Sequence, residues 1–192
     1  LGQGGGSAEA VRTRIRCAWG KFHELAPMLT RRGISLRIKG KIYKACVQKV
    51  LVYGSETWAM RAAESECLER AEKAMVRRMC KVSLSDRMTT ESLRNRLGIK
   101  GVLHIVKVGR LRWFGHVERM EEGNWVRGCR NLRVNGRVGR GRPLKTWQEC
   151  VDCDMRETGL SREMAQDRAE WRRGILGENV RPVFTRKRDV KR

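Results

Sequence analysis

The sequence predicts a mostly α protein, and three observations predict it. Apolar residues recur at three- and four-residue steps through most of the chain, which is the spacing of one helix face. No stretch shows the sustained alternation of apolar and polar residues that is typical of strands. Residues that favour helix ends also stand where the apolar pattern starts and stops, as Thr89 and Gly98 do on either side of a short periodic segment.

The elements follow from this spacing in chain order. The first predicted helical segment covers residues 8–29, with a break marked by Pro27 and Gly33. Residues 35–52 predict a second helix, although the letters VLVYG (50–54) suit a short strand as well. The clearest helix is 61–81, and its apolar stripe consists of Leu68, Ala71, Met75 and Met79. Further helices are expected at about 90–98, 102–120, 143–157 and 162–175, the last two opened by Pro143 and Ser161.

The same pattern predicts the domain organisation. Residues 1–7 form a glycine-rich lead-in, 8–120 a helical domain, 121–142 a basic Gly/Arg-rich loop, 143–176 a pair of helices, and 177–192 a basic tail. The chain opens with Leu1 rather than methionine, so we expect a fragment or an incomplete gene model.

The charge of the chain points to a polyanionic partner. Lys and Arg number 43 against 21 acids, a formal net charge of +22, which is far from that of a typical metabolic enzyme. Nucleic acid is favoured over an anionic membrane surface because most of the charge is arginine, whose planar fork suits phosphates and base edges. No apolar run reaches the length of a membrane span. We therefore expect no membrane partner. The seven cysteines are expected to be reduced thiols. An intracellular location is expected, and the nucleus is compatible with it.

Five phrases in a fixed order carry a resemblance to a known family. They are KIYKACVQKVLVYGSETWAM (41–60), LERAEKAMVRRMCKVSLSDR (68–87), GRLRWFGHVERM (109–120), GRGRPLKTW (139–147) and DMRETGLSREMAQDRAEWRR (154–173). In this order and spacing the chain resembles the C-terminal part of the polyprotein of non-LTR (LINE-type) retrotransposons, which usually carries an endonuclease followed by a reverse transcriptase. The resemblance covers roughly residues 8–175. It implies the thumb and connector region, and therefore a helical thumb-like bundle followed by a basic Gly/Arg-rich segment and two C-terminal helices.

The resemblance does not imply catalytic activity for this chain. The palm of such an enzyme carries a Tyr-x-Asp-Asp motif, and two-metal chemistry needs carboxylates that hold ions about 4 Å apart. This chain has no Asp-Asp pair, and its aspartates are scattered at 86, 152, 154, 167 and 189. We therefore expect a non-catalytic fragment that needs no cofactor and has no metal site.

Three groups of cations are the candidate nucleic-acid contacts. On the helix 102–120, Arg112, His116 and Arg119 share one stripe. For His116, a partly buried structural histidine and a catalytic histidine are the alternatives. A second stripe on the helix 61–81 consists of Arg70, Lys73, Arg77 and Lys81, and its alternative is an ordinary solvated face.

The third group lies in the acid-free stretch 123–148, which has seven basic residues and five glycines. Arg137, Arg140, Arg142 and Lys145 are its candidate contacts. The letters GRGRP (139–143) also look like the core of an AT-hook, which lies in the narrow minor groove of A·T tracts. This segment has three interpretations: a loop that binds the phosphate backbone of nucleic acid, a segment that recognises the minor groove, or a solvated flexible loop.

The cysteines and tryptophans have simpler interpretations. Cys150 and Cys153, with Cys129 and His116, include the ligand types of a zinc site, but their spacing fits no compact knuckle, so reduced structural thiols are preferred. Trp58, Trp113, Trp147 and Trp171 are expected to anchor the core. Trp125 stands in the acid-free stretch, and it has two interpretations: it stacks on a base, or it folds back onto a helix.

These features predict a non-catalytic nucleic-acid-binding fragment of a retrotransposon reverse transcriptase, which holds template RNA or target DNA through a basic face. A host-recruited helical scaffold for protein interactions is the alternative from another class, and a translated relic without a selected function is a third. An enzyme in its own right is disfavoured because no triad, carboxylate pair or phosphate loop can be assembled from the sequence.

Overall fold

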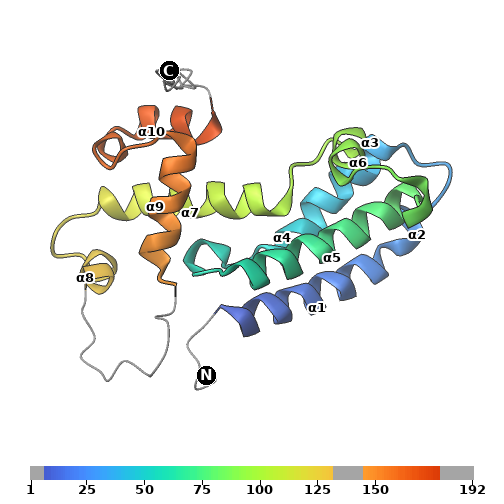
Figure 1. Cartoon of the computed structure of the whole chain (residues 1–192), viewed down its shortest axis with the longest axis horizontal. Helices are drawn as coiled ribbons and strands as arrows, with labels where there is room; N and C mark the ends of the chain where they lie inside the picture. The colour runs from blue at the N-terminus through green and yellow to red at the C-terminus, as the bar shows by residue number, and fades with distance from the viewer. Residues whose placement is uncertain (1–6, 132–144, 178–192) are drawn as a thin grey trace, which may run out of the picture. The chain divides into compact units, whose positions relative to one another are not determined.

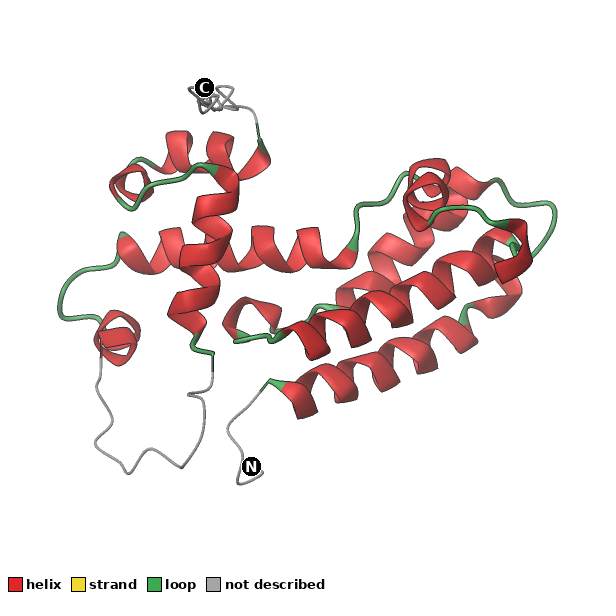
Figure 2. Ribbon diagram, in the orientation of Figure 1, coloured by secondary structure: helices red, strands yellow, loops and turns green. Residues whose placement is uncertain are grey.

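The structure is a computed structural model that describes residues 7–131 and 145–177. Helices connected by turns and short loops make up these residues, and none of them forms a strand (Figure 2). The mostly α prediction is confirmed, and the residues VLVYG end a helix rather than form a strand.

The chain divides into two compact units. The first consists of Leu1–Arg110 and Arg137–Cys150, and the second of Leu111–Gly136 and Val151–Arg192. The divisions fall within two helices, α7 (Val102–Glu118) and α9 (Trp147–Thr158). Each unit is described by itself.

The first unit is built on two long helices that lie side by side, α1 (Ala8–Glu24) and α5 (Ala62–Cys80) (Figure 1). The apolar stripe predicted on α5 is confirmed, since Leu68, Met75 and Met79 are fully buried. They pack in one hydrophobic core with residues of α1 such as Val11 and Phe22. Burial of these side chains is the main source of the stability of such a bundle.

The predicted helical segment 8–29 is confirmed, and it divides into two helices next to the predicted break at Pro27. α1 ends at Glu24, and a single turn, α2 (Ala26–Leu29), follows with Pro27 in its first turn. Proline has no N–H to continue the hydrogen-bond ladder of α1, and this missing donor is tolerated in the first turn of α2.

The second predicted helix is continuous but not regular. It consists of α3 (Leu36–Ile42), a π turn (Tyr43–Gln48) and α4 (Lys49–Leu51), and Ser35 caps it by accepting a hydrogen bond from the Ile38 N–H. Hydrogen bonds run from i to i+5 in a π turn, so this segment contains about one residue more per turn than an α-helix.

A buried carboxylate connects four parts of the first unit. Glu72 on α5 accepts hydrogen bonds from Arg94 Nη2 at 2.6 Å and from the Val102 N–H at 3.1 Å. Its other oxygen accepts from Gln48 Nε2 of the π turn at 3.3 Å. Arg94 lies on α6 (Thr90–Leu97) and Val102 begins α7. The cap at Thr89 and the stop at Gly98, with φ +69°, are confirmed for α6.

The second unit contains α8 (Trp125–Asn131), a 3₁₀ turn (Glu163–Gln166) and α10 (Arg168–Leu176), besides its parts of α7 and α9. Trp171 of α10 is buried, and its Nε1 donates to the Leu111 carbonyl of α7 at 2.9 Å. A Cβ on Gly115 would overlap the Trp171 ring, so glycine permits this contact. Phe114 is fully buried here.

Three boundaries differ from the sequence prediction. Trp125–Asn131 forms α8 where a loop is expected, because Asn124 caps it by accepting a hydrogen bond from the Val126 N–H at 2.9 Å. α9 begins at Trp147 after Thr146, which exchanges hydrogen bonds with Glu149, and Pro143 lies outside the described residues.

The third boundary is the start of the last helix. Asp167, not Ser161, caps α10, and residues 163–166 form the 3₁₀ turn. The Asp167 carboxylate accepts from the Ala169 N–H at 2.7 Å and from the Glu170 N–H at 3.2 Å.

Candidate nucleic-acid interface

The basic stripe predicted on α5 is only partly a surface. Arg70, Lys73 and Lys81 are exposed, and none of them makes an ion pair within the described residues. Arg77 is buried, and its guanidinium donates to the Ser83 carbonyl and, at 3.1 Å, to the Met88 carbonyl. Arg77 therefore holds the loop that follows α5 rather than presenting a free charge.

The cations of α7 also divide into exposed and structural residues. Arg112 and His116 are exposed and lie one turn apart on the same face. Arg119 lies one residue beyond the end of α7 and is half-buried, and its Nη1 donates to the Ala165 carbonyl at 2.6 Å. The expectation that Trp113 belongs to the core is wrong, because Phe114 holds the buried position. Trp113 is half-buried, with its ring centroid 5.6 Å from that of His116.

The acid-free stretch 123–148 is described only at its two ends. Arg137, Arg140 and Arg142 lie outside the described residues. Lys145 is exposed. At the other end, Trp125 is 86% exposed, so it is not folded back onto a neighbouring helix. Arg127 donates from Nη1 to the Met120 carbonyl at 2.7 Å, so its side chain connects α8 to the residues that precede the stretch.

A second acid-free stretch, residues 25–55, was missed by the sequence reasoning. It contains the run from α3 to α4, whose exposed face bears Arg37, Lys41, Lys44 and Lys49. The signal was present in the sequence, since no acid occurs between Glu24 and Glu56. We name these four residues the α3–α4 row.

One lysine of the same run has a structural role. Lys39 is buried, and its Nζ donates to the Met79 carbonyl near the end of α5 at 3.3 Å. Burial lowers the pKa of the Lys39 ammonium, and the charge of Lys81 lowers it further.

The electrostatic surroundings of α7 are cationic near its start. Burial lowers the pKa of His104, and the positive charges of Lys100 and Lys107 lower it further. Repulsion between cations on neighbouring turns would be relieved by an anionic partner.

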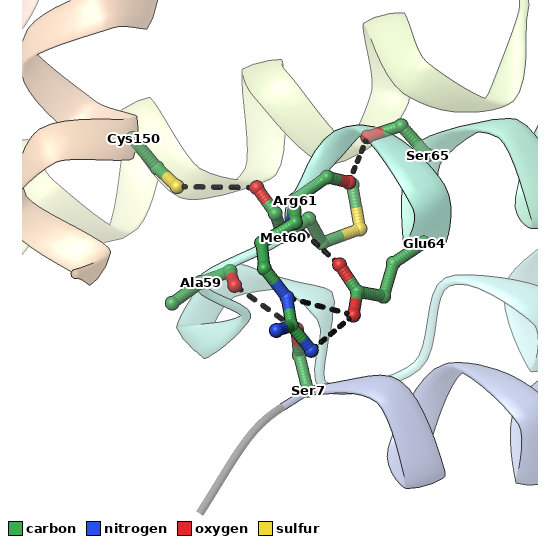
Figure 3. A network of polar contacts seen from close by, with 7 residues as sticks. All are labelled: Ser7, Ala59, Met60, Arg61, Glu64, Ser65 and Cys150. Atoms are coloured by element: carbon green, nitrogen blue, oxygen red, sulfur yellow. Dashed lines mark hydrogen bonds and ion pairs between the residues drawn. The ribbon is translucent and has the colours of Figure 1, made fainter. Parts of the chain in front are cut away.

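The described residues do not form the alternative zinc site. Cys150 is buried, and its thiol donates to the Met60 carbonyl at 3.7 Å, next to the contacts that fix the start of α5 (Figure 3). There Glu64 accepts from the Arg61 N–H at 2.7 Å, and Ser7 donates to the Ala59 carbonyl at 3.1 Å. Among the described histidine, cysteine and acidic side chains, no three lie together as metal ligands.

Trp58 and Trp171 are buried, as expected of core anchors. Trp147 is half-buried, and its Nε1 donates to the Glu56 carbonyl at 2.7 Å. Over the part of the chain that the structure describes, no helix has the length and apolar character needed to cross a membrane.

Comparison with known proteins gives one informative similarity. No family model and no solved structure matches the chain. The chain is 25% identical over 173 residues to an uncharacterized transposon-derived protein of Caenorhabditis elegans. The alignment covers 84% of this chain and 62% of that protein, so the chain spans less than two thirds of its relative's length. The similarity indicates a transposon origin for the chain.

Proposed function

We propose that the chain is a non-catalytic nucleic-acid-binding part of a non-LTR retrotransposon reverse transcriptase, corresponding to its thumb and connector. In this role it holds RNA or DNA through exposed cations and performs no chemistry. Template RNA and target DNA are its proposed partners, and the nucleus is its proposed location.

One observation carries the proposal: exposed cations without an acidic partner. The side chains of Arg70, Lys73 and Arg112 make no hydrogen bond or ion pair within the described residues. The +22 net charge means that such cations cannot all be neutralised by this chain's own acids. Phosphate oxygens are the partners that surplus arginine and lysine bind in nucleic acids.

Two further facts support the origin and the lack of turnover. A protein similar to this chain is transposon-derived, and the ordered phrases of the sequence resemble the region downstream of a polymerase palm. The sequence contains no Asp-Asp pair that would hold two catalytic metal ions.

Binding measured across a salt series tests the proposal. The purified chain is titrated with labelled single-stranded RNA, structured RNA and duplex DNA between about 0.05 and 0.2 M salt. We expect binding to all three, with an affinity that falls steeply and log-linearly as salt increases because counterions are released from the phosphates. A variant with Arg70, Lys73 and Arg112 replaced by glutamine should show a reduced salt slope.

The result also separates the competing functions. If the chain binds none of these nucleic acids at about 0.15 M salt, the proposal fails, and the scaffold and relic interpretations remain. The AT-hook alternative is tested separately, by replacing Arg140 and Arg142. A loss confined to A·T-rich duplex would assign that segment to the minor groove.

A further inference from the structure

The α3–α4 row is an exposed basic face on the helical run from Leu36 to Leu51. Arg37, Lys41, Lys44 and Lys49 are all exposed, while Tyr43, Val47 and Leu51 on the same run are fully buried. The run, which Figure 1 shows beside α5, thus has one face in the core of the first unit, against α1 and α5, and its other face is exposed.

The π turn brings the fourth cation into line with the other three. Arg37, Lys41 and Lys44 follow the four- and three-residue steps of one α-helical face. Lys49 is five residues after Lys44, and in a regular α-helix residues five apart point about 140° away from each other. Because hydrogen bonds run from i to i+5 across Tyr43–Gln48, a five-residue step amounts to about one turn there. The exposure of both Lys44 and Lys49 agrees with this register.

The row carries charge that the described residues do not neutralise. None of its four side chains makes a hydrogen bond or ion pair within the described parts of the chain. No acid occurs in residues 25–55, so the run itself supplies no counter-charge. The remaining exposed side chains of the face are those of Ile38 and Ala45, which have no donor or acceptor for a hydrogen bond to a base edge.

We propose that the α3–α4 row binds the sugar-phosphate backbone of one nucleic-acid strand without sequence preference. This inference rests on the proposed function and names the surface that performs it. At 1.5 Å per residue the row is about 18 Å long. One strand of a duplex has a phosphate about every 3.4 Å along the axis, so the row spans about five phosphates.

The test compares two variants with equal loss of charge. The row variant replaces Arg37, Lys41, Lys44 and Lys49 with glutamine. The control variant makes the same replacement at four exposed cations outside the row: Arg12, Arg16, Arg87 and Lys100. Both variants lose four positive charges, so a difference between them reports position rather than net charge. Circular dichroism checks that each keeps its helices.

The row variant is expected to lose about three units of salt slope on both single-stranded RNA and duplex DNA, because each phosphate contact contributes about 0.7 to 0.9. Its affinity should fall more than about tenfold at constant salt, and the control variant should change much less. A charge-keeping variant with Lys41, Lys44 and Lys49 changed to arginine should bind as the unmodified chain does. Lys49→Gln alone should weaken binding as much as Lys41→Gln.

Each other outcome has a definite meaning. If the unmodified chain binds and both four-site variants weaken equally, the row is not a site, while the proposed function survives. The row is equally overturned if its variant keeps full affinity, or if only vesicles with anionic lipid, and no nucleic acid, bind in a row-dependent way. Failure of the unmodified chain to bind any nucleic acid overturns both proposals.

Discussion

Glu72 is a single side chain on which much of the first unit depends. Its carboxylate is fully buried and accepts hydrogen bonds from Gln48, from Arg94 and from the Val102 N–H. Burial raises the pKa of Glu72, and the positive charge of Arg94 opposes that rise. Removing a buried carboxylate leaves its donors without an acceptor, which costs more than the intact pair contributes.

The first prediction concerns Glu72→Gln. The amide has one oxygen where the carboxylate has two, and its NH₂ group must face another donor. We expect a loss of about 2–4 kcal/mol in the free energy of unfolding, measured by urea denaturation. Glu69→Gln, an exposed change on the same helix, should stay within about 0.5 kcal/mol. Equal effects of the two changes would contradict the role given to Glu72.

The second prediction concerns the cap of α10. Hydrogen bonds from the Glu170 and Ala169 N–H groups hold the pKa of Asp167 below its ordinary value of 3.8. Since the folded-state pKa is depressed, the cap stabilises the fold above the ordinary pKa, and this contribution is lost as the pH falls through the folded value. An NMR titration of the Asp167 carboxyl should give a midpoint below 3.8.

Asp167→Asn is the control for this prediction, because asparagine caps a helix equally well but does not titrate. Its stability should fall less steeply than that of the unmodified chain below the ordinary pKa of Asp167. A carboxyl that titrates at or above its ordinary value would show that the two N–H groups do not stabilise the ionised form.

At the residue scale, spacing predicts which residues share a stripe but not which of them are buried. Arg77 fits the basic stripe of α5 as well as Lys73 does, yet it is buried because two loop carbonyls accept its N–H groups. Trp113 and Phe114 are adjacent aromatics, and Phe114 is the buried one, with its ring centroid 5.9 Å from that of Trp171. Contacts from distant parts of the chain determine which residue is buried, and the local spacing of residues holds no information about those contacts.

At the scale of elements, α5 and α6 show what the sequence predicts well. The long apolar stripe of α5 and the Thr89 and Gly98 ends of α6 are local signals, and the structure has both. The π turn could not be predicted in the same way, because the 3.6-residue period assumes an uninterrupted α-helix. Asp167 replaced Ser161 as a cap because the chain first makes a 3₁₀ turn.

The third prediction compares two helical glycines of the first unit. Gly40 on α3 is buried, and a Cβ there would overlap the Leu97 carbonyl of α6. Gly20 on α1 is exposed, with nothing within 4 Å of a Cβ. Gly40→Ala should lower the free energy of unfolding by about 1–3 kcal/mol through overpacking. Gly20→Ala should raise it by about 0.5–1 kcal/mol, since alanine is the better helix former.

Both glycine variants are measured by urea unfolding under the same conditions, and each acts as the control for the other. A Gly40→Ala variant as stable as the unmodified chain would contradict the close approach of α3 to α6 at Gly40, and destabilisation by Gly20→Ala would contradict the open space at that position. That approach helps to hold the run that carries the α3–α4 row.

At the scale of the whole molecule, the net charge of +22 has two consequences of opposite sign. Repulsion among like charges opposes folding, and added salt screens it. The fourth prediction is that the unfolding temperature rises by several degrees as sodium chloride increases from about 0.01 to about 0.15 M, while nucleic-acid affinity falls over the same range. Differential scanning calorimetry measures the first effect.

The row variant is also a matched control here. With four fewer positive charges, its unfolding temperature should depend less on salt than that of the unmodified chain. An unfolding temperature that is constant or falls with salt would show that repulsion among the surface cations does not limit stability. The same charge predicts a polyanionic partner from the sequence alone, whereas the position of the α3–α4 row required the structure.

The π turn has a further consequence for comparing this chain with its relatives. Such a turn is equivalent to one residue inserted into an α-helix. A relative that lacks one residue between positions 43 and 48 would keep both flanking helices in the same rotational register, with their buried and exposed faces unchanged. A single-residue gap at this point of an alignment is therefore expected to leave the fold intact, whereas the same gap in the middle of α5 would turn its apolar stripe away from the core.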